Sequence, residues 1–173
     1  MGLEYVILVN ENDQEIGKME KQEAHEKGLL HRAFSVFIFN DQKELLLQQR
    51  ALTKYHSAGL WTNTCCSHPR VDETIVQAAH RRLQEEMGFD CFLEVKTSFI
   101  YKADFDNGLT EHEFDHVLVG NFNGEVIINP TEVASYKWVA IDWLKQDMLK
   151  NPNNYTAWFT IISENFWQHF NEL

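Results

Sequence analysis

Short apolar stretches in the first third of the chain alternate with polar ones and predict strands. They lie at Tyr5–Val9, Ala33–Phe39 and Leu45–Gln49. The second stretch is rich in aromatic and β-branched residues, which favour an extended chain. Asn40 and Asp41 follow it and supply turn chemistry, so the last two strands are predicted to form a hairpin. Residues 10–32 are polar and are expected to be irregular.

A helical pattern replaces this alternation between Glu73 and Met87. The apolar residues recur at intervals of three and four, as on one face of a helix: Val76, Ala79, Leu83 and Met87. Gly88 follows directly, and glycine commonly ends a helix. The segment is therefore predicted to be an amphipathic helix.

The second half of the chain predicts three further strands and two helices. The strands are Phe92–Phe105, Phe114–Phe122 and Tyr136–Val139, with a turn at Asp106, Asn107 and Gly108. The helices are Ile141–Lys150 and Tyr155–Phe170, and the last has Trp158, Ile162, Phe166 and Phe170 at helical spacing. This order predicts an α/β or α+β fold, in which a mixed sheet is sandwiched between helices. A single domain over residues 1–173 is expected.

Composition narrows the possible partners. At 44% hydrophobic and 13% aromatic residues, the chain can bury a core. A net charge of −11 argues against nucleic acid as a partner, because phosphate binding needs clustered cations. An anionic substrate would need a locally basic site or a metal. No apolar run reaches the roughly 18 residues of a membrane helix, and no signal peptide is evident. The 3 cysteines suggest a reducing compartment. We expect a cytoplasmic monomer that acts on a small molecule.

The segment SHPRVDETIVQAAHRRLQEEMGF, residues 67–89, resembles the spaced signature of the Nudix family. The matching residues are Glu73, Arg81, Leu83, Glu85, Glu86, Gly88 and Phe89. Carboxylates at the end of a rigid helix offer the oxygen ligands that Mg²⁺ prefers beside substrate phosphates. Glu and Arg at these spacings also stabilise exposed helices without any function, by roughly 0.2–0.5 kcal/mol per pair. The length of the match favours the functional interpretation and implies a Nudix-type fold.

Two positions depart from the Nudix signature. Ser67 stands where the signature has glycine, and Arg82 stands where it has a glutamate. The arginine inverts a charge within the carboxylate cluster that a Nudix hydrolase uses to hold metals and activate water. Arginine makes bidentate contacts with phosphate oxygens. The change therefore favours a protein that binds a diphosphate without cleaving it.

A second group of residues combines imidazoles with carboxylates: His25, His31, His68, Glu111 and Glu113. Imidazole suits Zn, Mn or Fe better than Mg. Glu111 and Glu113 are two apart, so on an extended chain both face the same side. Taken singly, each histidine is more often a surface or structural residue, and spacing alone does not assign a metal site.

Five segments in order resemble type 1 isopentenyl-diphosphate isomerases, and the similarity runs over essentially the whole chain. They are AHEKGLLHRAF (24–34), QQRALTK (48–54), WTNTCCSHP (61–69), the altered Nudix segment and EHEFD (111–115). The resemblance implies a Mn²⁺ or Zn²⁺ site formed by His25, His31, His68, Glu111 and Glu113. It also implies a Mg²⁺ on the substrate diphosphate, held by Glu86 and the Cys66 carbonyl. The matching diphosphate-binding positions are Lys21, Arg50, Lys54 and Arg82.

The implied reaction converts isopentenyl diphosphate to dimethylallyl diphosphate, a step of isoprenoid biosynthesis, through a tertiary carbocation. Such chemistry needs an acid, a base and a pocket that excludes water. The resemblance assigns the proton transfers to Cys66 and Glu113, with Tyr101 beside them. Cys66 could instead be a buried small hydrophobe. Trp158 would stabilise the cation by about 0.5–2 kcal/mol, whereas periodicity alone favours a core position for it.

Two other functions are considered beside the isomerase. A Nudix diphosphohydrolase would release phosphate, and Arg82 argues against it. A non-catalytic Nudix-like binding module need not keep Cys66, Glu113 and the histidines together, so it ranks last. One assay separates the three by isomerised product, released phosphate or neither.

Overall fold

The computed structural model describes residues 3–105 and 107–170, without the side chains of residues 168–170. Its strands are β1 (Tyr5–Val9), β2 (Glu15–Glu20), β3 (His31–Phe39), β4 (Glu44–Arg50), β5 (Trp61–Thr62), β6 (Cys65–Ser67), β7 (Leu93–Asp104), β8 (Thr110–Asn121) and β9 (Val133–Ala140). Its helices are α1 (Lys21–Lys27), α2 (Ile75–Met87), α3 (Ile141–Lys150), the 3₁₀ turn η1 (Pro152–Asn154) and α4 (Ala157–Phe170).

The strands form one mixed sheet with β3 at its centre. β3 runs parallel to β8 along its whole length and antiparallel to β6, and β8 pairs with β7 as an antiparallel hairpin. β4 pairs with β9 and β5. The predicted hairpin of β3 and β4 is paired only at its tip, where Phe39 faces Leu45. Beyond that pair, β3 and β4 take different neighbours.

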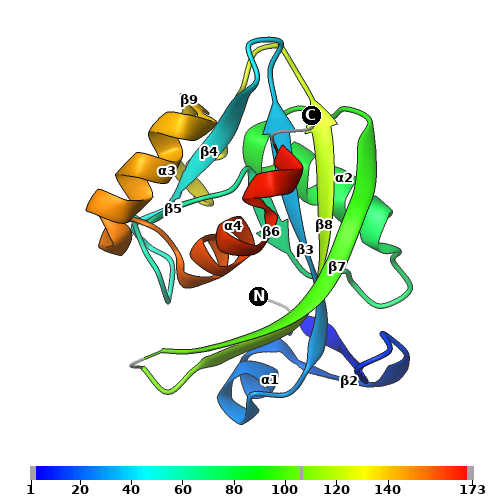
Figure 1. Cartoon of the computed structure of the whole chain (residues 1–173). Helices are drawn as coiled ribbons and strands as arrows, with labels where there is room; N and C mark the ends of the chain where they lie inside the picture. The colour runs from blue at the N-terminus through cyan, green and yellow to red at the C-terminus, as the bar shows by residue number, and fades with distance from the viewer. Residues whose placement is uncertain (1–2, 106, 171–173) are drawn as a thin grey trace.

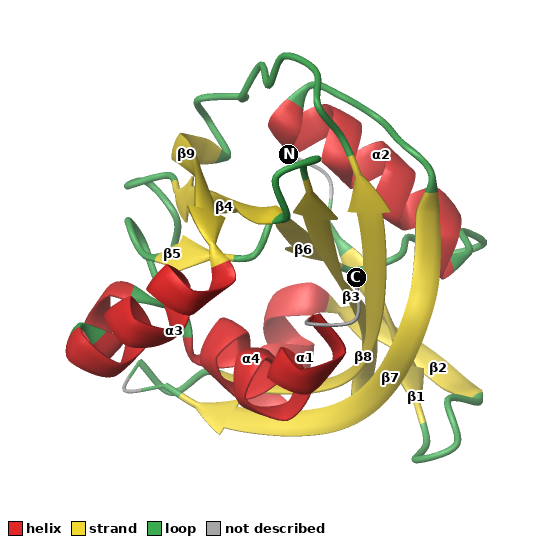
Figure 2. Ribbon diagram, turned by 45° about the horizontal axis from the view of Figure 1, so that its top comes forward, coloured by secondary structure: helices red, strands yellow, loops and turns green. Residues whose placement is uncertain are grey.

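Helices cover both faces of this sheet, with α2 on one side and α4 on the other (Figures 1 and 2). Because side chains alternate along a strand, β3 contributes to two cores. Phe34, Val36 and Ile38 pack on the α2 side. Phe37 and Phe39 pack with α3 and α4 on the other. The predicted mixed sheet between helices is confirmed.

The predicted amphipathic helix forms α2, two residues shorter at its start. Thr74 caps it, because the Thr74 side chain accepts from Gln77 N and the Gln77 side chain accepts from Thr74 N. Gly88 ends it at φ 73°. A Cβ at Gly88 would lie 2.3 Å from the Ile127 carbonyl oxygen, so close packing as well as the left-handed φ favours glycine.

The prediction that residues 10–32 are irregular is wrong, because they form β2 and α1. β2 pairs with β1 at the edge of the sheet and is largely exposed, so it has no apolar alternation. Helix α1 has 7 residues, capped by the Glu20 side chain and by Gly28 at φ 60°. It is too short and too charged to show a helical apolar stripe.

Other differences from the sequence-based elements are small. The last helix begins at Ala157, after η1, and not at Tyr155. Asp106 of the predicted turn and the side chain of Phe170 lie outside the described part of the chain. No helix among the described residues is long and apolar enough to cross a membrane.

Candidate active site

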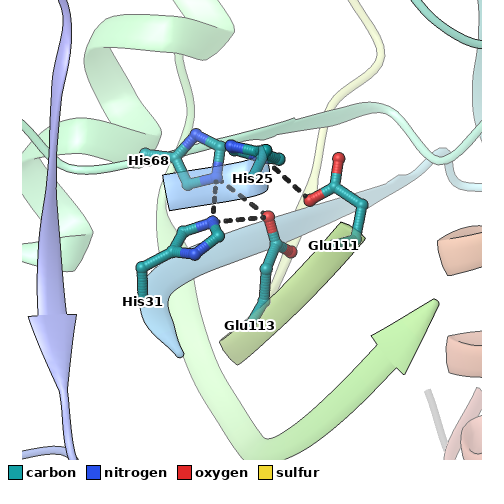
Figure 3. Close-up of side chains that lie close together, drawn as sticks. All are labelled: His25, His31, His68, Glu111 and Glu113. Atoms are coloured by element: carbon teal, nitrogen blue, oxygen red, sulfur yellow. Dashed lines mark hydrogen bonds and ion pairs between the residues drawn. The ribbon is translucent and has the colours of Figure 1, made fainter. Parts of the chain in front are cut away.

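Five side chains from four parts of the fold point toward one another (Figure 3). They are His25 on α1, His31 at the start of β3, His68 just after β6, and Glu111 and Glu113 on β8. One nitrogen or oxygen from each lies within 4.8 Å of all the others. The structure therefore brings together the whole group that the sequence singled out.

The sheet register explains how the cluster forms. The parallel pairing of β3 with β8 places His31 opposite Glu113. Glu111 and Glu113 are both buried because β8 alternates buried and half-buried residues from Thr110 onward. These carboxylates therefore share one face of the strand, as their spacing predicted.

Backbone carbonyls orient two of the histidines. His25 Nδ1 donates to Lys21 O at 2.6 Å, and His31 Nδ1 donates to Leu29 O at 2.8 Å. A carbonyl oxygen can only accept, so each ring carries a proton on Nδ1 and turns its Nε2 toward the cluster. His31 Nε2 lies 3.2 Å from His68 Nε2, which lies 2.8 Å from a Glu113 oxygen. Converging imidazole nitrogens and carboxylates held by outer partners are typical of metal sites.

The chemistry of this donor set fits a divalent metal. The three imidazoles and two carboxylates combine donors that suit Zn, Mn or Fe. All members except His68 are less than a tenth exposed. Without a cation, two carboxylates would share this small buried volume, which is unfavourable in a dry environment. The cluster is therefore a site that could hold a divalent metal.

Cys66 and Glu113 line one cavity beside this cluster, together with Tyr101 and Trp158. Cys66 is positioned by β6, where it pairs with Ser35 of β3. Burial raises the pKa of its thiol to about 12, so the sulfur keeps its proton at neutral pH. Tyr101 is opposite Glu113 in the β7–β8 hairpin, and its hydroxyl donates to Glu113 Oε2 at 2.6 Å.

The carboxyl of Glu113 has the opposite tendency. Burial would raise its pKa, but His31, Glu111 and Tyr101 together outweigh burial, and the pKa lies below its usual range. Burial also raises the pKa of Tyr101 well above its usual range, so that phenol stays a donor. At neutral pH the cavity thus contains a protonated thiol, which can donate a proton, and an ionised carboxylate, which can accept one.

The adjacent cysteines have different environments. Cys65 is fully buried and packs in the core beneath α2, while Cys66 is half-buried and reaches the cavity. Successive residues of a strand point to opposite faces. The register of β6 therefore selects Cys66 as the cysteine in the cavity.

Trp158 belongs to both the core and the cavity. It is buried in the core on the α4 side and also lines the cavity. Its Nε1 donates to Thr62 Oγ1 at 3.0 Å, which fixes the ring. The guanidinium carbon of Arg50 lies 5.1 Å from the ring centroid. The ring therefore already has a cation over its face, within the usual range of a cation–π contact.

Four cations also line this cavity: Lys21, Arg50, Lys54 and Arg82. Arg82 donates to Glu85 Oε2 at 2.7 Å, to Glu132 Oε2 at 3.0 Å and to Glu86. Lys54 forms a close ion pair with the same Glu132, and Lys21 donates to Glu4 at 3.1 Å. Cations and carboxylates alternate here, as in a site that could hold an anion together with a metal ion.

Comparisons with known proteins agree with this geometry. The sequence model of the NUDIX domain family matches residues 29–159 of this chain. "Isopentenyl-diphosphate Delta-isomerase 2" of Photorhabdus laumondii is 55% identical over 92% of this chain and 90% of that protein. "Isopentenyl-diphosphate Delta-isomerase" of Pectobacterium atrosepticum is 53% identical over 98% and 97%. The chain belongs to the isopentenyl-diphosphate Delta-isomerase family of Nudix proteins.

Solved structures share the fold of this isomerase-family chain. DR0079 from Deinococcus radiodurans superimposes with a TM-score of 0.71 at 20% identity, covering 86% of this chain and 90% of that one. The MutT protein from Methanosarcina mazei gives 0.64 at 18%, covering 83% and 94%. At these identities the likeness extends to the Nudix fold alone.

Sequence reasoning missed several residues that line the cavity of this family member: Gln48, Tyr55, His56, Ser67 and Glu132. Ser67 is the position where glycine was expected. Gln48 Nε2 donates to Glu86 Oε2 at 2.8 Å and so orients that buried carboxylate. Most of these residues lie on loops or short strands without periodicity. Only Ser67 carried a sequence signal, as a departure from the Nudix signature.

Asp115 was also missed, although a signal for it existed. It continues the spacing of two that links Glu111 and Glu113, and it is fully buried. Burial, together with the nearby Glu113, raises the pKa of Asp115 well above its usual range. Extending the alternation by one step along the strand would have placed it beside the cluster.

Proposed function

We propose that the protein converts isopentenyl diphosphate to dimethylallyl diphosphate, as an enzyme of isoprenoid biosynthesis. The observation that carries the proposal is that Cys66 and Glu113 share one cavity, which four cations also line. Relatives at 53–55% identity bear the name isopentenyl-diphosphate Delta-isomerase. The cavity thus combines a proton donor, a proton acceptor and a place for an anionic group.

The proposed diphosphate site consists of Lys21, Arg50, Lys54 and Arg82. Guanidinium groups bind phosphate oxygens with two parallel hydrogen bonds, and ammonium groups act as point charges. Glu86 and the Cys66 carbonyl would hold the Mg²⁺ that accompanies the diphosphate. Arg82 disfavours a hydrolase, because it donates to Glu85 and Glu86 where a further carboxylate would otherwise help to hold metal.

Proton transfer is assigned to Cys66 and Glu113, acting on opposite faces of the substrate. One adds a proton to the alkene and the other removes one from a neighbouring carbon. Tyr101 keeps Glu113 in place through its 2.6 Å hydrogen bond. Trp158 offers an aromatic face for the tertiary cation, at a value of about 0.5–2 kcal/mol. The rings of Tyr101 and Trp158 would restrict the water that could trap the cation on their side of the cavity.

His25, His31, His68, Glu111 and Glu113 would hold Mn²⁺ or Zn²⁺. When bound, such an ion changes the proton affinity of the carboxylate that it touches. Elemental analysis of purified protein is expected to give about one transition metal ion per chain. Full activity in chelator with Mg²⁺ alone, in protein free of transition metal, would contradict this assignment.

The decisive assay is proton NMR of isopentenyl diphosphate with the protein and Mg²⁺ in D₂O. We expect dimethylallyl diphosphate with deuterium in the methyl group formed from the terminal methylene, because thiol and carboxyl protons exchange with solvent. Released phosphate without isomerised product would indicate a hydrolase, and neither product would indicate a binding module. Isomerised product without deuterium would keep the isomerase and contradict the two-residue mechanism.

A cytoplasmic monomer that binds neither nucleic acid nor membrane completes the proposal. Light scattering after size exclusion is expected to give the mass of one 20.3 kDa chain.

A further inference from the structure

We propose that His56 is a positioning residue. It fixes the Glu111 carboxylate of the metal cluster relative to the Trp158 side of the cavity. His56 lies in the loop between β4 and β5 and is not one of the five residues of the cluster. The proposal rests on the proposed function for its effect on turnover. Its effect on metal retention can be measured without any turnover.

The loop is built to direct His56 inward. Backbone bonds close its base, since Arg50 N donates to Leu60 O at 2.9 Å and Gly59 N donates to Arg50 O at 3.1 Å. Ser57, the next residue, has φ 49°, in the left-handed region that non-glycine residues seldom adopt. The chain thus turns sharply just after His56. The side chain of His56 is only 7% exposed, although the neighbouring Tyr55 is exposed.

The imidazole of His56 completes the surroundings of Glu111. Its Nε2 lies 3.5 Å from Glu111 Oε1, while His25 Nε2 lies 3.1 Å from Glu111 Oε2. The carboxylate therefore sits between two rings, one on each oxygen. Ligating carboxylates commonly have such outer partners, which set their orientation.

The contacts of His56 also indicate which nitrogen carries its proton. Nδ1 lies 3.3 Å from Ser57 Oγ, whose hydroxyl can donate to it. Nε2 faces a carboxylate, which can only accept. The arrangement therefore favours the proton on Nε2, so that an N–H faces Glu111 Oε1 across 3.5 Å.

The other sides of the same ring touch the aromatic wall of the cavity. The ring stacks on Phe105 at a centroid distance of 5.4 Å and meets Trp158 edge-on at 5.7 Å. The His56 carbonyl accepts from Arg50 at 3.3 Å, and Arg50 in turn lies over Trp158. His56 thus contacts the metal cluster through a nitrogen and the Trp158–Arg50 pair through its ring and backbone.

These two contacts can be separated by substitution. His56→Phe keeps a flat ring against Phe105 and Trp158 but has no donor for Glu111. His56→Gln keeps an N–H donor at a similar reach but lacks the ring. His80→Phe and His80→Gln are matched controls, because His80 on α2 pairs with Asp90 at 2.5 Å and is not among the residues lining the cavity.

The first measurement is the rate at which Co²⁺-loaded protein loses its metal to a chelator, followed by visible absorption. Loss of an outer-sphere partner typically costs 10- to 100-fold in metal affinity. We expect His56→Phe to lose Co²⁺ roughly 10- to 100-fold faster, with a changed absorption spectrum. His56→Gln should stay near the parent rate, and both His80 variants should match the parent.

The second measurement is turnover of the metal-loaded variants. His56→Gln is expected to lower kcat, because Trp158 and Arg50 lose a packing partner, although its metal is retained. Ser57→Ala is a milder variant that removes the hydroxyl beside Nδ1, and it should shift Co²⁺ loss in the same direction as His56→Phe by a smaller factor. Thermal unfolding of each variant shows whether it has folded.

Two results would overturn the proposal. One is Co²⁺ loss and spectra in His56→Phe and Ser57→Ala that equal those of the parent. The other is equal loss of metal in His56→Phe and His56→Gln, since that would indicate a general packing role. A protein that retains Co²⁺ as expected but yields no isomerised product would contradict the proposed function and leave the role of His56 in metal retention standing.

Discussion

The metal cluster of the cavity and its cationic group are built in different ways. The cationic group consists of Lys54 and Arg82, which share the partner Glu132. In the metal cluster, His25 and His31 are almost fully buried, and backbone carbonyls fix their rings. In the cationic group, Lys54 and Glu132 keep about a quarter of their side chains exposed, and Lys54 and Arg82 both pair with the flexible side chain of Glu132. The metal cluster is fixed by the sheet, and the cationic group is held by ion pairs that can exchange partners.

This difference indicates what each group can do. The rings of the cluster are held by backbone carbonyls and its strands by the sheet, as in preorganised sites. Glu132 occupies Lys54 and Arg82 of the cationic group, and Glu4 occupies Lys21. A diphosphate must compete with these carboxylates. A Mg²⁺ ion that takes up carboxylate oxygens would leave the cations to the phosphates.

The largest effect on turnover is expected at the proposed acid–base pair, Cys66 and Glu113. Cys66→Ala and Glu113→Gln should each lower kcat by roughly 10²–10⁴-fold, the usual contribution of a positioned acid or base. Steady-state kinetics measures this. Metal content must be measured in Glu113→Gln, since this variant changes a residue of the cluster.

Cys65→Ala is the matched control, because the neighbouring cysteine packs in the core and is not among the cavity-lining residues. It should cost stability and leave kcat near the parent value. An inactive Cys65→Ala beside an active Cys66→Ala would mean that the register of β6 has been misassigned.

The next effect concerns the cationic group alone. Arg82→Gln is expected to raise KM for isopentenyl diphosphate roughly 10- to 100-fold, because a charged hydrogen bond contributes about 1.5–3 kcal/mol. Arg82→Glu should be worse, since it adds a carboxylate beside Glu85, Glu86 and Glu132.

Arg81→Gln is the control for this prediction. Arg81 pairs with Glu73 and Glu85 and is not among the cavity-lining residues. An Arg82→Gln protein whose KM and kcat equal those of Arg81→Gln would assign Arg82 to the helix surface.

A smaller, graded effect tests the buried character of the thiol. Because the pKa of Cys66 lies at about 12, its reactive thiolate fraction should rise tenfold for each pH unit between 7 and 10. Alkylation by iodoacetamide, followed by mass spectrometry in a Cys91→Ser background, measures the rate. A rate that levels off near pH 9 would show an ordinary solvated thiol.

The smallest expected effect is a different response to salt of the cationic group and of the metal cluster. Raising NaCl from about 0.05 to 0.5 M shortens the screening length from roughly 14 to 4 Å. KM should then rise a few-fold, because the cationic group is partly exposed. Co²⁺ loss from the buried cluster should not change. An equal response of both quantities would remove the distinction between the two groups.

Periodicity and signatures predicted the parts of this fold that have a regular pattern. Helix α2 and the β7–β8 hairpin were placed within a few residues, because each has a long apolar pattern with clear end signals. Helix α1 was missed because its contribution to the core is limited to Ala24 and His25. A helix of this length depends on its caps and its tertiary packing more than on its own pattern.

The residues of the candidate site also differ in whether a sequence pattern revealed them. Glu111 and Glu113 could be paired from their spacing, but no local rule joins them to His25 or His68. The resemblance to a family supplied those residues. His56 and Glu132 had no signal of either kind, because a loop side chain is directed by turns and long-range contacts that periodicity does not encode.

The parallel pairing of β3 with β8 has a consequence for how the chain folds and acquires a metal ion. His31 and Glu113 are about eighty residues apart, and they meet only when these strands align. Pairings between distant segments form slowly, because the intervening chain must first lose its freedom. A slip by one residue would turn Glu113 to the opposite face. If the cluster holds an ion as proposed, the full set of five ligands forms only in chains that have completed this alignment, and the metal content of a preparation should follow the fraction of such chains.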